Sequence, residues 1–240
     1  MLEGVEISKS FGAYQVLRSV SVRVAPGEAL GIVGPNGAGK TTLFGVLAGA
    51  LTPSSGTVRL DGFDLTASKA SQRCIMGIGR THQVPRPFLG MSVFENVLAA
   101  AAFGGALAGR SAHEGAARAL DRSGLAEFAD RPAATLGLLD RKRLELARAL
   151  ATNPKVILLD EIGGGLTESE LVELIELVAE LKHSGMTIIW IEHILHALLK
   201  VVDRLVCMAE GTIIAEGSPR AVMADKAVMK AYLGGVDEPA

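Results

Sequence analysis

Two cysteines are all that this chain of 240 residues contains, and neither points to a disulfide or a metal site. Cys74 and Cys207 lack metal-ligand spacing and stand among Val, Ile and Met residues. We therefore expect buried free thiols and a reducing compartment. Long apolar runs are missing too, since the longest, residues 97–109, has 13 residues against the roughly 20 that cross a bilayer. Any membrane role must come through a partner.

A strong charge bias is also missing. The chain has 24 Lys and Arg against 26 Asp and Glu, which gives a formal net charge of −2. This balance argues against a broad basic surface, so we expect no nucleic-acid partner. We interpret the basic cluster at residues 141–143 as a solvated helix face. The start of the chain lacks the basic and apolar segments of a signal peptide, so we expect a protein that is not exported.

The most informative pattern that is present is a glycine-rich stretch. Residues 34–41 match G-x-x-x-x-G-K-[ST], the Walker A pattern of a phosphate-binding loop (P-loop). The apolar run Ala29–Val33 predicts the buried strand that precedes such a loop, and Thr41–Ala48 predicts the helix that follows it. The candidate nucleotide ligands are Gly34, Pro35, Asn36, Gly37, Ala38, Gly39, Lys40, Thr41 and Thr42.

The residue types of this loop suit a phosphate chain. Glycine permits backbone conformations closed to other residues, so successive N–H groups can point at phosphate oxygens beside a helix N-terminus. Lys40 would bring a mobile ammonium to the outer phosphates, and the Thr41 hydroxyl would ligate Mg²⁺. The plainer alternative is a glycine-rich turn in front of a core helix.

Two acids follow a second apolar strand, Val156–Leu159. Asp160 and Glu161 would lie at the carboxyl edge of a parallel sheet, where ligands of open α/β folds bind. Asp160 is placed to hold Mg²⁺ through its water shell, and Glu161 to orient or deprotonate an attacking water. The alternative is a strand that simply ends in solvated carboxylates.

Two further polar residues can be assigned a function only in combination with these motifs. Gln83 follows a strand-like segment, Ile75–Ile78, and its amide could contact both Mg²⁺ and water. His193 follows the apolar strand Thr187–Ile191, and its imidazole could contact a γ-phosphate. Taken alone, a glutamine is usually just exposed and a histidine is more often a structural residue.

The order of the elements predicts an α/β fold. Short strands come first, then Ala- and Leu-rich helices over residues 91–151, then alternating strands and helices that imply a parallel sheet. Besides the strands named above, we expect strands at Gly4–Ile7, Val20–Val24, Thr57–Leu60, Arg204–Met208 and Thr212–Ala215. The expected helices are Glu114–Ala129, Arg141–Ala151, Glu168–His183, Ile194–Val201 and a last one capped by Ser218 and Pro219.

Together, the P-loop, Gln83, the helical segment, Asp160-Glu161 and His193 resemble the ATP-binding subunit of ABC transporters over residues 2–233. The runs 77–83, 87–97, 143–148 and 232–234 look especially like the importers of branched-chain amino acids. The implied fold is a P-loop NTPase with a mostly parallel core sheet and an N-terminal antiparallel β subdomain. Residues 1–90 and 152–233 would form the nucleotide-binding core, residues 91–151 an inserted helical subdomain, and residues 234–240 a tail.

The resemblance also implies an activity, the hydrolysis of ATP with Mg²⁺. It gives catalytic roles to Lys40, Gln83, Glu161 and His193. It gives metal ligation to Thr41, Gln83 and Asp160. An aromatic side chain should stack on the adenine, for which Phe11 is the first choice and Tyr14 the second.

The partners implied by the resemblance are several. Two ATP-binding subunits would sandwich two ATP molecules and drive a pair of integral membrane permeases, which a periplasmic binding protein supplies with solute. The chain would then lie on the cytoplasmic face of the inner or plasma membrane as a peripheral subunit. A permease would dock around Phe88–Phe103, although core packing is the more common fate of such apolar residues.

Departures from the family pattern are as informative as the matches. The family signature, Leu-Ser-Gly-Gly-Gln, aligns with residues 136–140, which read Leu-Gly-Leu-Leu-Asp. The signature presents small residues and a helix N-terminus to the γ-phosphate on the opposite subunit, and Leu138 and Leu139 add bulk there. The aspartate expected after Leu166 is Thr167. Thr167 and Asp140 could instead cap the helices that follow them, Thr167 in a capping box with Glu170.

The two altered motifs predict a heterodimer whose two ATP sites are unequal. The residues that a subunit uses on its own nucleotide are intact, whereas both elements that it offers to the opposite nucleotide are altered. The alternative is that the backbone around Gly137 still contacts phosphate normally. Other loads for the same ATPase are lipopolysaccharide export and urea or amide import, and a nucleotide-dependent assembly module without transport is a third possibility.

Overall fold

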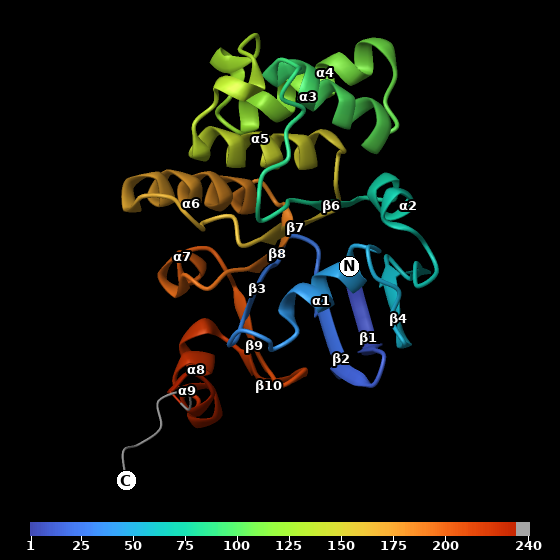
Figure 1. The fold of residues 1–240 in the computed structure, drawn as a ribbon, viewed down its shortest axis with the longest axis vertical. Helices are drawn as coiled ribbons and strands as arrows, with labels where there is room; N and C mark the ends of the chain where they lie inside the picture. The colour runs from blue at the N-terminus through green and yellow to red at the C-terminus, as the bar shows by residue number, and fades with distance from the viewer. Residues whose placement is uncertain (234–240) are drawn as a thin grey trace.

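The chain folds into two β-sheets with a helix between them (Figure 1). The computed structural model describes residues 1–233, so the predicted tail at 234–240 lies outside the described residues. The first sheet is antiparallel, as predicted for the N-terminal part of the chain. Its strands run in the order β2 (Tyr14–Val24), β1 (Leu2–Phe11), β4 (Ser55–Leu60) and β5 (Phe63–Asp64).

The second sheet is the mostly parallel one that the alternation of elements predicts. Every neighbouring pair in it is parallel except the hairpin of β9 and β10. Its order is β10 (Thr212–Gly217), β9 (Arg204–Ala209), β3 (Ala29–Val33), β8 (Thr187–Ile191), β7 (Val156–Asp160) and β6 (Ile78–Arg80). The fold class is therefore confirmed.

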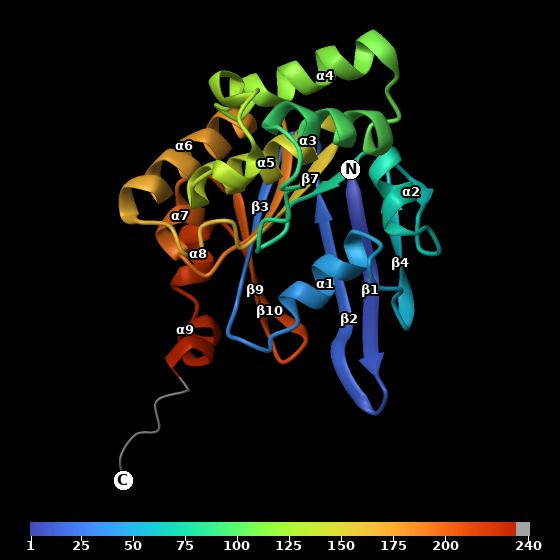
Figure 2. The same ribbon diagram turned by 45° about the horizontal axis from the view of Figure 1, so that its top comes forward.

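Both faces of the parallel sheet are covered, which explains its continuous apolar strands. Helix α1 (Lys40–Leu47) packs on the face that carries Leu30 and Ile32, between this sheet and the antiparallel one (Figure 2). The opposite face, with Ala29 and Val33, joins the core of the remaining helices. Successive residues of a strand point to opposite faces, so a strand with two covered faces must be apolar throughout.

The remaining helices fall into two groups. One group follows strands of the parallel sheet and comprises α6 (Glu168–His183), α7 (Leu195–Leu199), α8 (Pro219–Met223) and α9 (Lys226–Leu233), while the short α2 (Ala70–Ile75) leads from β5 into β6. The other occupies the top of Figure 1 and comprises α3 (Val93–Ala99), η1 (Ala100–Gly104), α4 (Gly109–Arg122), η2 (Ala126–Phe128), η3 (Ala133–Thr135) and α5 (Leu138–Ala151). The second group falls within the stretch predicted as a helical insert.

The strand register brings the chemical motifs to one edge of the sheet. Ile191 of β8 pairs with Ile32 of β3 on one side and with Asp160 of β7 on the other. The P-loop begins just after β3, and Glu161 follows β7. Because parallel strands end at the same edge, residues far apart in the chain meet there.

One predicted strand was wrong. Most of Ile75–Ile78 is not strand, because residues 70–75 form α2 and β6 begins only at Ile78. Gly77 has φ +111, a left-handed backbone conformation that separates the helix from the strand. The buried side chain of Arg73 is part of α2, a tertiary contact that no local pattern announces.

Two predictions about helix ends were also wrong. The helix predicted at Glu114–Ala129 ends at Arg122, because Gly124 takes φ +68 and Leu125 N donates to the Leu120 carbonyl at 2.9 Å, a Schellman closure. Asp140 does not cap α5, since the helix begins at Leu138 with Gly137 as its N-cap. The capping box of Thr167 and Glu170 at the start of α6 is confirmed.

Candidate functional site

The P-loop has the backbone that a phosphate cradle requires. Gly34 and Gly39 have φ +146 and +97, and a Cβ at Gly34 would lie 2.1 Å from the Met208 carbonyl oxygen. Gly37 has φ +80 with open space around it, so its glycine is needed for the backbone conformation alone. Asn36, Gly37 and Thr41 are exposed at the start of α1. The loop therefore leaves its N–H groups beside an open helix N-terminus.

Lys40 is buried and bonded to the loop itself. Its Nζ donates to the Gly34 carbonyl oxygen at 2.7 Å and to the Pro35 carbonyl oxygen at 3.0 Å. Burial lowers the pKa of Lys40, and the charge of Glu161 opposes that shift. Neither hydrogen bond is to a carboxylate, so an anionic group at the loop would meet an ammonium whose charge is not neutralised by a direct ion pair.

Glu161 is where three predicted catalytic residues come together. Gln83 Nε2 donates to Glu161 Oε2 at 2.6 Å, and His193 Nδ1 lies 3.9 Å from the same oxygen. The backbone of Glu161 has φ +46, uncommon for glutamate, and its N–H donates to the Ile191 carbonyl at 2.9 Å. The structure thus joins residues 83, 161 and 193, which the sequence could only place at the ends of separate strands.

Asp160 is held differently from its neighbour. Its Oδ2 accepts from Arg80 Nη2 at 2.8 Å, and its backbone N–H donates to the Thr81 hydroxyl at 3.2 Å. The carboxylate is buried. Arg80, at the end of β6, is a residue that we did not predict, and the signal was its position beside Gln83 at a strand end.

The donor set suits Mg²⁺ together with a phosphate better than a free cation. Within residues 1–233, no group of three or more His, Cys, Asp and Glu side chains is placed to hold a metal ion. The predicted ligands Thr41, Gln83 and Asp160 supply one carboxylate and two neutral oxygens. Mg²⁺ typically takes one or two carboxylates, several waters and the phosphates of a substrate, so the residues fit a magnesium nucleotide.

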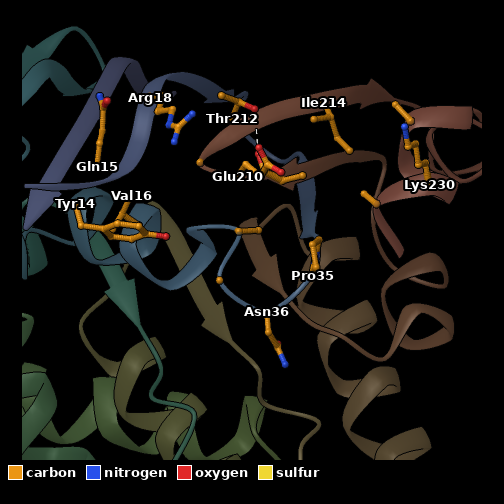
Figure 3. A pocket seen from close by; sticks show the side chains of 16 residues that line it. Tyr14, Gln15, Val16, Arg18, Pro35, Asn36, Glu210, Thr212, Ile214 and Lys230 are labelled. Atoms are coloured by element: carbon orange, nitrogen blue, oxygen red, sulfur yellow. Dashed lines mark hydrogen bonds between the residues drawn. The ribbon is translucent and has the colours of Figure 1, made fainter. Parts of the chain in front are cut away.

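A pocket of about 780 Å³ opens beside the P-loop (Figure 3). Tyr14 and Asn36 line it, together with Glu210 of the turn between β9 and β10 and Lys230 of α9. Phe11, the first choice for the adenine, is not among the described residues that line it; its ring lies 5.1 Å from the Lys9 ammonium. Phe11 and Tyr14 are paired positions at the end of the hairpin of β1 and β2.

The segment that aligns with the family signature opens α5. Leu138 is the first residue of the helix and is 40% exposed, whereas Leu139 is buried. A Cβ at Gly165 would lie 3.2 Å from the Leu138 side chain. An isobutyl group therefore stands at the N-terminus of α5, where glycine would leave the N–H groups open.

The family of the chain follows from a comparison with known proteins. A family profile described as "ABC transporter" matches residues 17–163, which include the P-loop, Gln83 and the pair Asp160-Glu161. The chain belongs to the ABC transporter family. A second profile, "Branched-chain amino acid ATP-binding cassette transporter", matches residues 209–238 of this ABC protein.

Curated relatives of this ABC protein cover nearly its whole length. It is 38% identical to the high-affinity branched-chain amino acid transport ATP-binding protein LivG of Escherichia coli, over 93% of this chain and 94% of the relative. It is 34% identical to the corresponding protein BraF of Pseudomonas aeruginosa, over 98% of both. It is also 34% identical to the lipopolysaccharide export system ATP-binding protein LptB of Acidithiobacillus ferridurans, over 98% and 97%.

Solved structures agree with this membership. The ADP conformation of an ATP-binding cassette of an ABC transporter superposes with a TM-score of 0.87 at 33% identity, over 98% of both chains. A nucleotide-free ATP-binding cassette gives 0.88 at 32% identity, over 99% of both. Within residues 1–233 of this ABC protein, no helix is both long and apolar enough to cross a membrane.

Proposed function

We propose that this chain is the ATP-hydrolysing subunit of an importer of branched-chain amino acids. ATP binding follows from its family. The observation that supports hydrolysis is the 2.6 Å contact of Gln83 with Glu161, beside His193 and near enough to Lys40 for the Glu161 charge to act on that lysine. The solute is proposed from the names of the LivG and BraF relatives.

Each side chain then has a task in the attack of water on the γ-phosphate. Glu161 accepts the Gln83 hydrogen bond with Oε2, and its Oε1 has no hydrogen bond to another described residue, so that oxygen is available to orient or deprotonate a water. Lys40 must exchange its two carbonyl partners for an outer phosphate oxygen. His193 would reach the γ-phosphate from the Glu161 side. Thr41, Gln83 and Asp160 would hold Mg²⁺, which would supply positive charge beside the phosphate oxygens.

The base of the nucleotide would extend toward the hairpin of β1 and β2. Asn36, Gly37 and Ala38 line the pocket there, and so does Tyr14. Phe11 stays our first choice for the stacking residue and Tyr14 the second. Replacing each by alanine and measuring the KM for ATP assigns the contact, because stacking on a base contributes about 1–3 kcal/mol, or roughly 5- to 150-fold in affinity.

Glu161→Gln is the direct test of hydrolysis. The amide keeps the shape but cannot take a proton, so we expect turnover to fall at least about 100-fold while a fluorescent ATP analogue binds with unchanged affinity. Glu176→Gln, an exposed acid on α6, serves as the matched control and should keep full activity. Turnover unchanged in Glu161→Gln would refute the assigned role.

The second ATP-binding subunit is, in our proposal, a different chain. Two such subunits share two nucleotides, and Leu138 crowds the helix N-terminus that this chain would offer to the opposite nucleotide. The competent site would combine this P-loop with a partner's unaltered signature. ATPase assays of the chain alone and of the paired complex test this, and full activity of the chain alone would contradict it.

The permease is proposed to dock around Phe88–Phe103, together with the apolar residues that lead into this stretch from Gln83. Val84, Phe88, Leu89 and Met91 are all at least 40% exposed. Buried Asn96 holds this segment, because it accepts from Phe88 N–H at 2.7 Å and donates to the Phe88 carbonyl at 3.0 Å. A rigid apolar ridge beside the catalytic glutamine suits a partner that must sense the nucleotide.

This arrangement carries the rest of the proposal. Residues 1–90 and 152–233 would form the nucleotide-binding core and residues 91–151 the helical insert, on the cytoplasmic face of the plasma membrane. A periplasmic binding protein would deliver the solute. Uptake of radiolabelled leucine by vesicles with the reconstituted transporter tests the load, and ATP-dependent lipopolysaccharide release instead of leucine uptake would favour the LptB-like alternative.

A further inference from the structure

A buried lysine outside the P-loop lies beside the proposed hydrolytic site. Lys142 of α5 is only 4% exposed, which corrects its interpretation as part of a solvated face. Its Nζ donates to the Gln83 backbone carbonyl at 3.5 Å, the one hydrogen bond of this ammonium to another described residue. An ammonium has three donors, and burying one with a single long hydrogen bond is costly. For the stability of the fold alone, an apolar side chain would be more favourable at this position.

A buried carboxylate, that of Glu192, compensates the positive charge of Lys142. Glu192 is 0% exposed and follows β8 directly before His193. Burial lowers the pKa of Lys142, and the charge of Glu192 opposes the shift and so favours the protonated ammonium. The two charges therefore attract one another inside the protein without a direct ion pair, and either group is costly to bury once the other is removed.

Glu192 in turn accepts hydrogen bonds from two backbone N–H groups near Glu161, one in the segment that follows Glu161 and one at His193. Its Oε2 accepts from Gly163 N–H at 2.9 Å, two residues beyond Glu161. Its Oε1 accepts from His193 N–H at 3.0 Å and lies 3.2 Å from His193 Nδ1. A Cβ at Gly163 would lie 3.0 Å from Oε2, so glycine is what lets the carboxylate approach.

We propose that Lys142 is a positioning residue for hydrolysis: its hydrogen bond ties α5 to the Gln83 carbonyl, and its charge is balanced by Glu192, which holds the His193 backbone, so that Gln83 and His193 meet at Glu161. This inference rests on the proposed ATPase function. The three residues lie on different parts of the chain: Lys142 on α5, Gln83 just after β6 and Glu192 just after β8. Lys142 lies one turn after Leu138, the first residue of α5, so the helix whose N-terminus we propose to face the opposite nucleotide also supports this chain's own hydrolytic residues.

The kinetic consequence is specific. Lys142 bonds to the Gln83 segment and not to the P-loop, so its loss should misplace the hydrolytic residues and spare nucleotide binding. We expect Lys142→Met to lower kcat about tenfold or more in the assembled transporter, with the KM for ATP within about twofold, since misplacement by about 1 Å can cost 100-fold in rate. Lys142→Arg, which keeps the charge, should recover most of kcat.

A double-mutant cycle separates positioning from simple loss of stability. Glu192→Gln removes the counter-charge, so Lys142→Met combined with Glu192→Gln should lose less kcat than the product of the two single losses. Lys200→Met, an exposed lysine at the end of α7, is the control and should match the parent. All kcat values are normalised to the nucleotide-binding sites titrated in each preparation, so a variant that folds poorly is still informative.

The outcomes are distinguishable from failure of the proposed function. If Glu161→Gln abolishes turnover while Lys142→Met leaves kcat per binding site unchanged, only the positioning role of Lys142 is overturned. That role is also overturned if the losses at Lys142 and Glu192 multiply, or if KM rises with kcat unaltered. If Glu161→Gln itself turns over ATP normally, the proposed function fails first.

Discussion

Arg73 offers a sharp test of how the P-loop helix is anchored at its far end. The side chain is fully buried, and burial lowers its pKa, with the charge of Asp64 opposing the shift. Its guanidinium donates to four backbone carbonyls, those of Val46 at 2.6 Å, Leu47 at 2.9 Å, Thr66 at 3.1 Å and Ser68 at 3.1 Å. Val46 and Leu47 are the last residues of α1, whose C-terminal carbonyls have no partners within the helix.

The stability that Arg73 contributes can be estimated from the carbonyls that it bonds. Lys40 at the start of α1 and Arg73 at its end bracket a helix of 8 residues, too short to be stable alone. Arg73→Met keeps the aliphatic stem but removes every donor, and each buried carbonyl left unsatisfied costs about 1–3 kcal/mol. We count about 2 kcal/mol for the Leu47 carbonyl, which loses its partner, and about 1 kcal/mol for the Val46 carbonyl, which still accepts from Gly49 N–H at 3.2 Å. The expected loss is therefore about 3 kcal/mol, partly offset because a buried charge is also removed.

Tryptophan fluorescence provides the assay. Trp190 is the single tryptophan of the chain and is fully buried in β8, so its emission reports unfolding. With a urea slope of about 3 kcal/mol per molar, a net loss of about 2 kcal/mol lowers the midpoint by about 0.7 M. Arg118→Met on the exposed face of α4 should shift it by less than about 0.2 M. A shift for Arg73→Met as small as that of the control would refute the reasoning.

Two further predictions concern close packing and protonation. Gly34→Ala should abolish binding of an ATP analogue, because its Cβ would lie 2.1 Å from the Met208 carbonyl, whereas Gly62→Ala, which has open space, should bind normally; binding by both would contradict the clash. Burial raises the pKa of Cys207 to about 11, so only about one Cys207 thiol in a thousand is ionised at pH 8, and Cys207 should resist alkylation in the native protein at that pH. Labelling is read at Cys207 by peptide mapping, because Cys74, expected to be buried, is only partly so. Because the unfolded thiol ionises first, the stability from this group is lost as pH rises above about 9, and rapid labelling of Cys207 in the native protein at pH 8 would argue against the burial effect.

Local patterns predicted much of the architecture. The strand Ala29–Val33 and the helix Glu168–His183 were found at their observed bounds, because their apolar periodicity and the Thr167 cap lie within the segments themselves. The helix α3 lies within the stretch predicted as helical, residues 91–151, but its start was not assigned although Ser92 and Glu95 form a capping box. The wrong assignment at residues 75–78 has a different cause, since the burial of Arg73 against α1 depends on residues elsewhere in the chain.

The sequence by itself determined the P-loop, because a strand, nine consecutive residues and a helix carry all of its chemistry within one stretch of chain. Only the tertiary structure decided what stands around Glu161. Gln83 is 78 positions away in the chain and still donates to it at 2.6 Å, and Lys142 proved to be buried beneath Gln83 instead of exposed on a helix face. The physical reason is that parallel strands end at a common edge, where the residues that meet depend on which strands are adjacent. That strand order is set by packing over the whole sheet and not by any local pattern.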